Sequence, residues 1–512
     1  MSENKDGEKT GLKRAPRRRA ISWLKRIGAG LFVLILLYVL LLIPESEVTL
    51  SESPTGNPFV WNRDSVWASL ETLFKNARQS GCESSAVSAD SLMHSVRDCI
   101  DKIQRDGLHP ASREVDSLEY AMFHLAAVVA ACPDRLPQYL TLYMRMREAV
   151  KTQSQSWDMS SAPVRRTLYR LLYGGRAAVE EIMLQAPPDA VPALATGVDE
   201  PSATPAAEIL GVTIHSGDIL VSRGGAPTSA LIARGNDYPG NFSHVALVYV
   251  DQQTHKASVI ESHIEKGVAV ASLDEYLADK KLRVMVLRLR ADLPQLTVDP
   301  LLPHKAASHA LSDATSRHIP YDFEMDYDND DKMFCSEVAS TPYAAFGVRL
   351  WMGMSTISSP RLRMCLASLG VTHFETQEPS DLEYDPQLRV VAEWRDPATL
   401  YKDHLDNAVI DAMLDNVDPG TPLGYDRLLL PVARVTRGYS LLLNAIGKIG
   451  PVPEGMSAAI ALRVFRFSDT HSRISLRLLR LADEFRQNQG FTPPYWVLVR
   501  LAGQAYGSHA AE

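Results

Sequence analysis

Apolar residues recur at intervals of three and four positions from Trp61 to about Gln185, as in DSVWASLETLFKNA, DSLMHSVRDCIDKIQ and YAMFHLAAVVAAC. This interval places the apolar side chains on one face of an α-helix. The pattern predicts a bundle of amphipathic helices, which we assign to a helical domain over residues 44–186. The next stretch, residues 187–209, is rich in proline and alanine and shows no period, which predicts a linker.

From residue 210 the pattern changes to short β-type runs. Five of them stand at 218–222, 244–250, 257–261, 268–272 and 284–290. Turn residues separate several of the runs, so we expect consecutive strands to pair as an antiparallel meander. Two helices are predicted to follow, near 303–317 and 335–347. Strands followed by helices favour an α+β domain over alternating α/β, and we assign this domain to residues 210–375.

Helical periodicity returns in the C-terminal region, residues 376–512. Candidate helices stand at 397–416, 424–447, 456–488 and 494–504. The helix from Met456 to Gln487 is rich in arginine, and a basic amphipathic helix can lie on an anionic membrane surface. The alternative is that the arginines form a solvated face on a helix that packs against its neighbours. We favour this second interpretation.

The N-terminus combines a basic segment with an apolar run. Nine lysines or arginines lie within residues 5–26, and Ile27 to Ile43 carry no charge. At the rise of an α-helix this run is about 25 Å long, so we predict a transmembrane anchor at 27–43. Basic flanks stay cytoplasmic, which makes residues 1–26 a cytoplasmic tail and the rest of the chain periplasmic at a bacterial inner membrane. A cleaved signal peptide is the alternative, but the run exceeds a usual h-region and no A-x-A-like site follows it.

Net charge and cysteine content bear on the class of partner and on the cellular compartment. A net charge of −8 gives no basic footprint for nucleic acid, so we expect no nucleic-acid partner. The five cysteines fit an oxidising compartment. Cys82, Cys99 and Cys132 fall in the helical domain, where one pair can form a disulfide, and the sequence leaves the pairing open.

Three residues of the α+β domain have side chains suited to nucleophilic catalysis. Cys335, in KMFCSEVAS, stands at the start of a predicted helix, where the helix dipole lowers a thiol pKa. His244 opens a predicted strand, so its ring can face a neighbouring helix terminus. Glu261 closes the next run, and in an antiparallel hairpin its carboxylate can orient His244. Alone, a cysteine between apolar residues is more often a small core residue.

The order of four segments, GDILVSRGG, SHVALVY, VIES and PYDFEMDYDNDDKMFCSE, resembles the permuted NlpC/P60 hydrolases, in particular the YiiX/YaeF-type papain-like cysteine amidases. The resemblance covers residues 212–350. It implies a papain-like antiparallel sheet with helices, in which Cys335 is the nucleophile, His244 the base and Glu261 the orienting acid. An acyl-enzyme at an amide or ester would follow, with an oxyanion hole from the Cys335 backbone N–H and a second donor, for which Tyr321 is our candidate.

Metal and cofactor sites are not expected. Asp326, Asp328 and Asp330 alternate like the ligands of a calcium loop, but Asp331 stands where that loop needs glycine. We interpret His215, His255 and His263 as surface histidines. Neither a phosphate-binding glycine loop nor a zinc-spaced cysteine set occurs in the sequence.

The sequence therefore predicts a membrane-anchored cysteine hydrolase that acts outside the cytoplasm. Cell-wall peptide amides and lipid acyl groups both remain open as substrates, with hydrolysis or transfer as the reaction. A catalytically silent module for binding or assembly, with the helical flanks as its partner surface, is the alternative from another class. The presence of all three candidate triad residues argues against that alternative.

Overall fold

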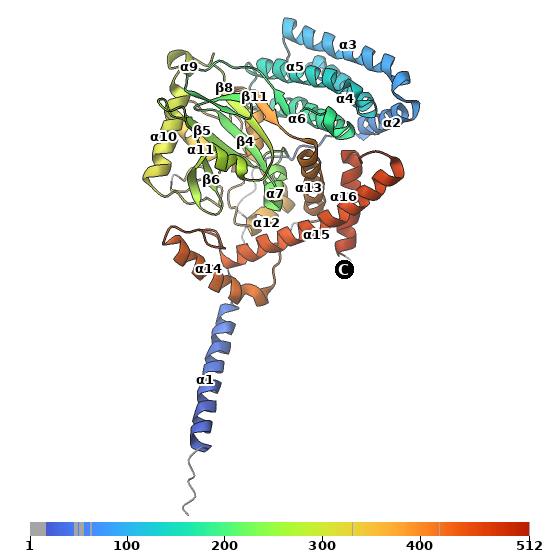
Figure 1. Cartoon of the computed structure of the whole chain (residues 1–512). Coiled ribbons are helices and arrows are strands. Elements are labelled where there is room, and N and C mark those ends of the chain that lie inside the picture. The colour runs from blue at the N-terminus through green and yellow to red at the C-terminus, as the bar shows by residue number, and fades with distance from the viewer. Residues whose placement is uncertain are drawn as a thin grey trace, which may run out of the picture.

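A seven-stranded antiparallel sheet with helices around it forms the centre of the molecule (Figure 1). The computed structural model describes residues 17–45, 50, 56–61, 64–329, 331–418 and 420–510. The combination of helices with an antiparallel sheet confirms the α+β class.

The strand order in the sheet is β1-β11-β8-β4-β5-β6-β7. The bounds are β1 (Leu194–Thr196), β4 (Ile219–Gly224), β5 (His244–Val250), β6 (Ala257–His263), β7 (Gly267–Ser272), β8 (Lys281–Leu289) and β11 (Leu388–Trp394). Strands β4 to β7 form the predicted meander. The prediction is wrong for the fifth run, because β8 pairs with the free edge of β4 instead of with β7. In the described chain two further antiparallel pairs lie outside this sheet. One is the hairpin of β2 (Ala206–Ile209) with β3 (Val212–His215), and the other pairs β9 (Ser355–Thr356) with β10 (Glu375–Thr376) across a longer connection. The two faces of the sheet are covered by separate apolar clusters.

Two strands of the sheet lie outside the range that the sequence assigned to the α+β domain. The expected linker 187–209 contains β1 and β2, and β11 lies beyond residue 375. β1 has three residues, of which only Ala195 is buried, so it carries no readable alternation. Both β1 and β11 are held by ladder bonds to distant segments, which a local pattern does not report.

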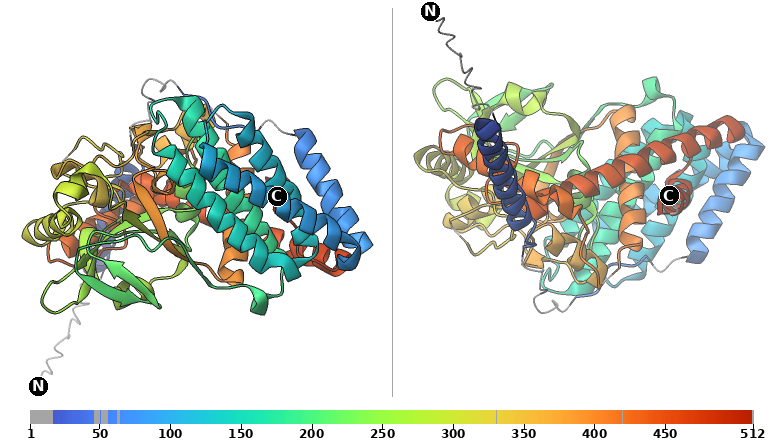
Figure 2. Two further views of the ribbon diagram at one scale, coloured as in Figure 1. Left: turned by 90° about the horizontal axis from the view of Figure 1, so that it is seen from above. Right: turned by 90° about the horizontal axis from the view of Figure 1, so that it is seen from below.

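The N-terminal bundle packs around one large apolar core. Its helices are α2 (Asp64–Ser80), α3 (Cys82–Asp106), α4 (Arg113–Ala131), α5 (Leu136–Ser154) and α6 (Ala162–Gln185). A disulfide between Cys82 and Cys132 joins the start of α3 to the end of α4, while Cys99, Cys335 and Cys365 are free. Seen from above, the bundle lies beside the sheet (Figure 2).

The remaining helices surround the sheet and extend below it. Six short to medium α-helices of the described chain lie within the α+β domain, α7 (Pro227–Arg234), α8 (Leu273–Ala278), α9 (Pro294–Val298), α10 (Leu302–Ser316), α11 (Glu337–Ala345) and α12 (Pro360–Ser368). The C-terminal ones are α13 (Pro397–Asp415), α14 (Leu430–Asn444), α15 (Ala458–Gln489) and α16 (Tyr495–Ala510). In the view from below, α15 runs beneath the sheet towards the bundle (Figure 2).

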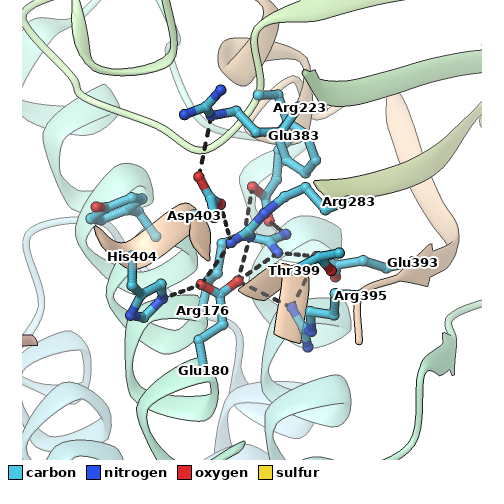
Figure 3. A network of polar contacts seen from close by, with 12 residues as sticks. Arg176, Glu180, Arg223, Arg283, Glu383, Glu393, Arg395, Thr399, Asp403 and His404 are labelled. Atoms are coloured by element: carbon cyan, nitrogen blue, oxygen red, sulfur yellow. Dashed lines mark hydrogen bonds and ion pairs between the residues drawn. The ribbon is translucent and has the colours of Figure 1, made fainter. Parts of the chain in front are cut away.

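Buried charges join the bundle, the sheet and α13 (Figure 3). Glu180 of α6 accepts from Arg283 of β8 at 2.5 Å and lies 3.1 Å from Nε2 of His404 on α13. Arg283 also reaches Asp403 at 2.6 Å, and Arg176 of α6 pairs with Glu393 of β11. Burial alone would raise the pKa of Glu180, but Arg283 and the other cations lower it well below its usual range. The helical bundle and the sheet therefore share one charged interior rather than meeting through a solvated seam.

The N-terminal helix α1 (Arg17–Leu41) stands away from the rest of the molecule (Figure 1). Within the described residues, no helix is both long and apolar enough to cross a lipid bilayer, so the anchor predicted at 27–43 is not supported. Residues 1–16 of the predicted basic tail lie outside the described part. The large apolar side chains from Leu31 to Leu40 are exposed, and the end of α1 meets α14, where Arg434 donates to the Leu41 carbonyl at 3.0 Å.

Candidate active site

The three residues singled out by the sequence lie on neighbouring elements. His244 is the first residue of β5, Glu261 lies on β6, and Cys335 precedes α11 by two positions. In the β5–β6 ladder Glu261 is opposite Ala246. Side chains two apart on a strand share a face, so Glu261 and His244 lie on the same face of the sheet at its end.

A carboxylate between two imidazoles is the central feature of the site. Nε2 of His244 lies 2.9 Å from Oε2 of Glu261, and Nε2 of His263 lies 2.9 Å from Oε1. Burial would raise the pKa of Glu261, but the hydrogen bonds and charges of both histidines lower it well below its usual range. Glu261 is therefore an anion that is hydrogen-bonded to the His244 ring and lies within ion-pair distance of the His263 ring.

His263 is not the surface histidine that the sequence predicted. It is partly buried, and its ring centroid lies 5.7 Å from that of His244. The signal was present in the strand pattern, because Glu261 and His263 are two positions apart on β6 and so share a face. His215 contacts the Thr204 carbonyl at 2.9 Å, and His255 is exposed.

The contact to Glu261 assigns the two nitrogens of His244 different roles. An imidazole that donates from Nε2 to a carboxylate keeps its proton there, which leaves Nδ1 as the acceptor. Nδ1 is thus the nitrogen available for a proton from a nucleophile.

The Cys335 sulfur is buried against the backbone on both sides of His244. Its thiol donates to the Ser243 carbonyl at 3.9 Å, and the Val245 N–H is oriented to donate to the thiolate. Among the described residues, no hydrogen bond joins this sulfur to the His244 ring. The nucleophile candidate and the base candidate are neighbours whose side chains are not hydrogen-bonded in this state.

The expected lowering of the thiol pKa is wrong for this state. Burial, and then the charge of Glu378, raise the pKa of Cys335 to about 12. The helix begins only at Glu337, with Ser336 as its N-cap residue, so Cys335 lies outside the first turn. Desolvation of the thiolate outweighs the few donors that reach it.

Hydrogen bonds fix the backbone around Cys335 on both sides. Ser262 of β6 donates to the Met333 carbonyl at 2.7 Å. Glu337 accepts from the Phe334 N–H at 2.8 Å, and Ser336 donates to the Gln377 carbonyl at 2.6 Å. The segment that carries the thiol is thereby held to β6 and to the 377–381 loop.

The 377–381 loop is a part of the site that sequence reasoning missed. Glu378 is buried, and burial followed by the charge of Asp381 raises its pKa well above its usual range. Burial also raises the pKa of Asp381, to about 8. The loop stands some forty residues after Cys335 and carries no motif, so only the fold brings it near the thiol.

Tyr321 pairs through a backbone bridge with Met333, two residues before the thiol. Burial, and then the charge of a Cys335 thiolate, raise the pKa of Tyr321 well above its usual value. Its hydroxyl therefore keeps its proton and can donate.

The acidic segment before Cys335 has a structural role. Asp322 accepts from the backbone N–H groups of Glu324 and Asp326 at 2.9 and 2.7 Å, which closes a turn. Asp330 of the calcium-like series lies outside the described residues. In the part of the chain that the structure describes, no group of three or more His, Cys, Asp or Glu is placed to hold a metal ion. Asp218 is likewise structural, since it pairs with Arg288 at 2.8 Å.

Comparison with known proteins gives one match. The family model described as "Permuted papain-like amidase enzyme, YaeF/YiiX, C92 family" matches residues 213–392. The matched span runs from β3 to β11 and includes Cys335, His244 and Glu261. Searches of curated proteins and of solved structures find no match.

Proposed function

Through residues 213–392 the chain belongs to the permuted papain-like cysteine amidases, and we propose that Cys335, His244 and Glu261 are its catalytic triad. The observation that carries this proposal is the bond from Nε2 of His244 to Glu261, with the Cys335 sulfur against the backbone on both sides of His244. This arrangement leaves Nδ1 as the acceptor for the thiol proton.

The reaction begins from a protonated thiol, as the raised pKa of Cys335 requires. When a carbonyl enters the site, Nδ1 of His244 takes the thiol proton as the sulfur attacks. Glu261 stabilises the imidazolium that forms. The imidazolium then gives its proton to the leaving amine or alcohol, which leaves an acyl group on Cys335. Water or another acceptor, activated by His244, releases that group.

The backbone N–H of Cys335 and the Tyr321 hydroxyl are our proposed oxyanion donors. The raised pKa of Tyr321 supports this role, because a donor must hold its proton while negative charge develops beside it.

We place the enzyme at a bacterial inner membrane with most of the chain in the periplasm. The Cys82–Cys132 disulfide supports an oxidising compartment. The exposed apolar side chains of α1 support attachment to lipid, since water is a poor solvent for a helix that is apolar on every side.

Cell-wall peptide amides are the first substrate class we propose, and lipid acyl groups are the second. One contact favours the second class. His318, in the segment leading to Tyr321, lies 2.7 Å from Glu454, which belongs to the connection between α14 and α15. The catalytic segment therefore touches the same helical layer that receives α1.

Product analysis tests the proposed function. The full chain is incubated with cell-wall fragments and, separately, with phospholipids and acylated peptides, and the products are identified by mass spectrometry. Cys365→Ala is the matched control, since Cys365 is also a buried free cysteine. We expect product with the wild type and Cys365→Ala and none with Cys335→Ala. An equal amount of product with Cys335→Ala would contradict the proposed triad. Absence of product from every substrate would favour a catalytically silent binding module.

A further inference from the structure

Helix α14 carries a stripe of exposed apolar side chains that no part of the described chain covers. Its members are Val432, Val435, Tyr439 and Leu442 of α14, with Leu428 in the short 3-10 helix before it and Ile446 just after it, each between 56 and 70% exposed. Successive members are three or four residues apart, so they form a single face of the helix. The opposite side of α14, at Leu430 and Ala433, packs on Ala458 and Ala459 of α15. The stripe therefore points away from the body of the molecule.

The stripe is continuous with the apolar surface of α1. Tyr38 near the end of α1 donates to the Leu428 carbonyl at 3.0 Å, and Arg434 donates to Leu41. Figure 1 shows α14 lying across the point where α1 leaves the body. A contact with a second protein would cover one side of a helix, whereas α1 exposes apolar side chains on all sides from Leu31 to Leu40. A lipid environment can contact the apolar side chains on all sides of the helix at once.

Basic residues predominate along the stripe, while the acidic Asp426 lies just before it and the acidic Glu45 lies beside it. Between Arg427 and Gly450 the sequence holds four basic residues and no acidic one. Two of them, Arg434 and Arg437, line a cavity of ≈ 420 Å³ with Gly438, Leu441, Ser457 and Glu45. Glu45 contributes a carboxylate to this lining, and that carboxylate accepts from the Ser457 hydroxyl at 2.5 Å. Arginine guanidinium groups suit phosphate oxygens through paired hydrogen bonds.

We propose that the apolar stripe of α14 and the Arg434–Arg437 cavity form a docking surface for an anionic phospholipid bilayer. The stripe enters the boundary between headgroups and acyl chains, as amphipathic helices rich in arginine and lysine do. The cavity takes a headgroup phosphate. This surface is distinct from α1, since α14 lies along the membrane plane instead of projecting from the body.

Photocrosslinking of the full chain in vesicles tests the stripe. Benzoylphenylalanine replaces Leu442, and the matched control site is Val87 on α3, which is 79% exposed. The vesicles contain phosphatidylcholine with about one-third phosphatidylglycerol. We expect lipid adducts at position 442 and not at position 87. Equal adducts at both sites, none at 442, or a crosslink between two copies of the chain would overturn the proposal.

Substitution in the cavity tests the headgroup subsite. The adduct yield at position 442 is compared in vesicles with and without phosphatidylglycerol, for Arg437→Gln and for Arg97→Gln, an exposed arginine on α3. In anionic vesicles we expect the adduct yield at position 442 to be about fivefold lower for Arg437→Gln, because this is the contribution of one basic residue near an anionic surface. Identical yields for the two variants, with unchanged melting temperatures, would overturn the phosphate assignment.

Discussion

Burial raises the pKa of the Cys335 thiol, while a nearby helix N-terminus lowers the pKa of a thiol. At Cys335 the effect of burial is the larger one. Cys335, His244 and Glu261 could be singled out from the sequence because each stands beside a predicted strand or helix boundary. Their proposed roles as a triad came from the resemblance to the permuted papain-like amidases. The protonation state was not readable, since it depends on the distant 377–381 loop and on how deeply the sulfur is enclosed. His263 lay within reach of a strand-pattern argument, through its two-residue spacing from Glu261.

Removing the charge of Glu261 tests its orienting role. Glu261→Gln keeps the shape but removes the negative charge that stabilises the His244 imidazolium, so we expect kcat to fall by about a hundredfold or more. The exposed Glu265→Gln is the matched control and is expected to keep wild-type kcat. A fall of less than about threefold for Glu261→Gln would contradict the assigned role.

The alkylation rate of Cys335 in the free enzyme depends on its raised pKa. With a pKa of about 12 the thiolate fraction grows about tenfold per pH unit, so the iodoacetamide rate is expected to rise steadily from pH 7 to pH 10. The measurement is peptide mapping of labelled Cys335 against time at each pH. A plateau near neutral pH would instead indicate a thiolate–imidazolium pair already formed in the resting state.

At the scale of elements, local pattern predicted the long helices and the β4–β7 meander, and it missed β1 and β11. The meander was accessible because each strand is followed by its partner and turn residues mark the reversals. Strands β1 and β11 pair across nearly two hundred residues of chain, and β1 is too short to show alternation. The α14 stripe was hidden for another reason, since exposure of an apolar face depends on what the rest of the fold leaves uncovered.

The Cys82–Cys132 disulfide closes a loop of 50 residues between α3 and α4. Cross-links of this kind restrict the unfolded chain, so Cys82→Ser is expected to lower the free energy of unfolding by about 2–4 kcal/mol. Cys99→Ser, at a free cysteine of the same helix, serves as the control and is expected to cost less than about 1 kcal/mol. Urea denaturation measures both, and equal effects would contradict the disulfide's role.

At the scale of the whole molecule, the charged interior couples three regions that the sequence treats as separate domains. Arg283 lies between Glu180 of the bundle and Asp403 of α13 and is fully buried. Single-sequence reasoning has no access to this coupling, because each residue alone resembles an ordinary surface charge.

Removal of one member leaves the others buried and unpaired. Arg283→Ala is therefore expected to lower the free energy of unfolding by about 3–5 kcal/mol. The bundle and the sheet should still unfold in one transition, as monitored by circular dichroism and tryptophan fluorescence. Lys280→Ala, at an exposed position next to β8, is the control with little effect. Two separate transitions in the wild type would contradict a shared interior.

The central claim is that Cys335, activated by His244, carries the acyl group. An acid-quenched reaction of the full chain with a short p-nitrophenyl ester, followed by peptide mapping, measures this most directly. The account predicts an acyl thioester on Cys335 in the wild type and in Cys365→Ala, strongly reduced in His244→Ala. An acyl group found on another residue, or an unchanged yield on Cys335 without His244, would contradict it.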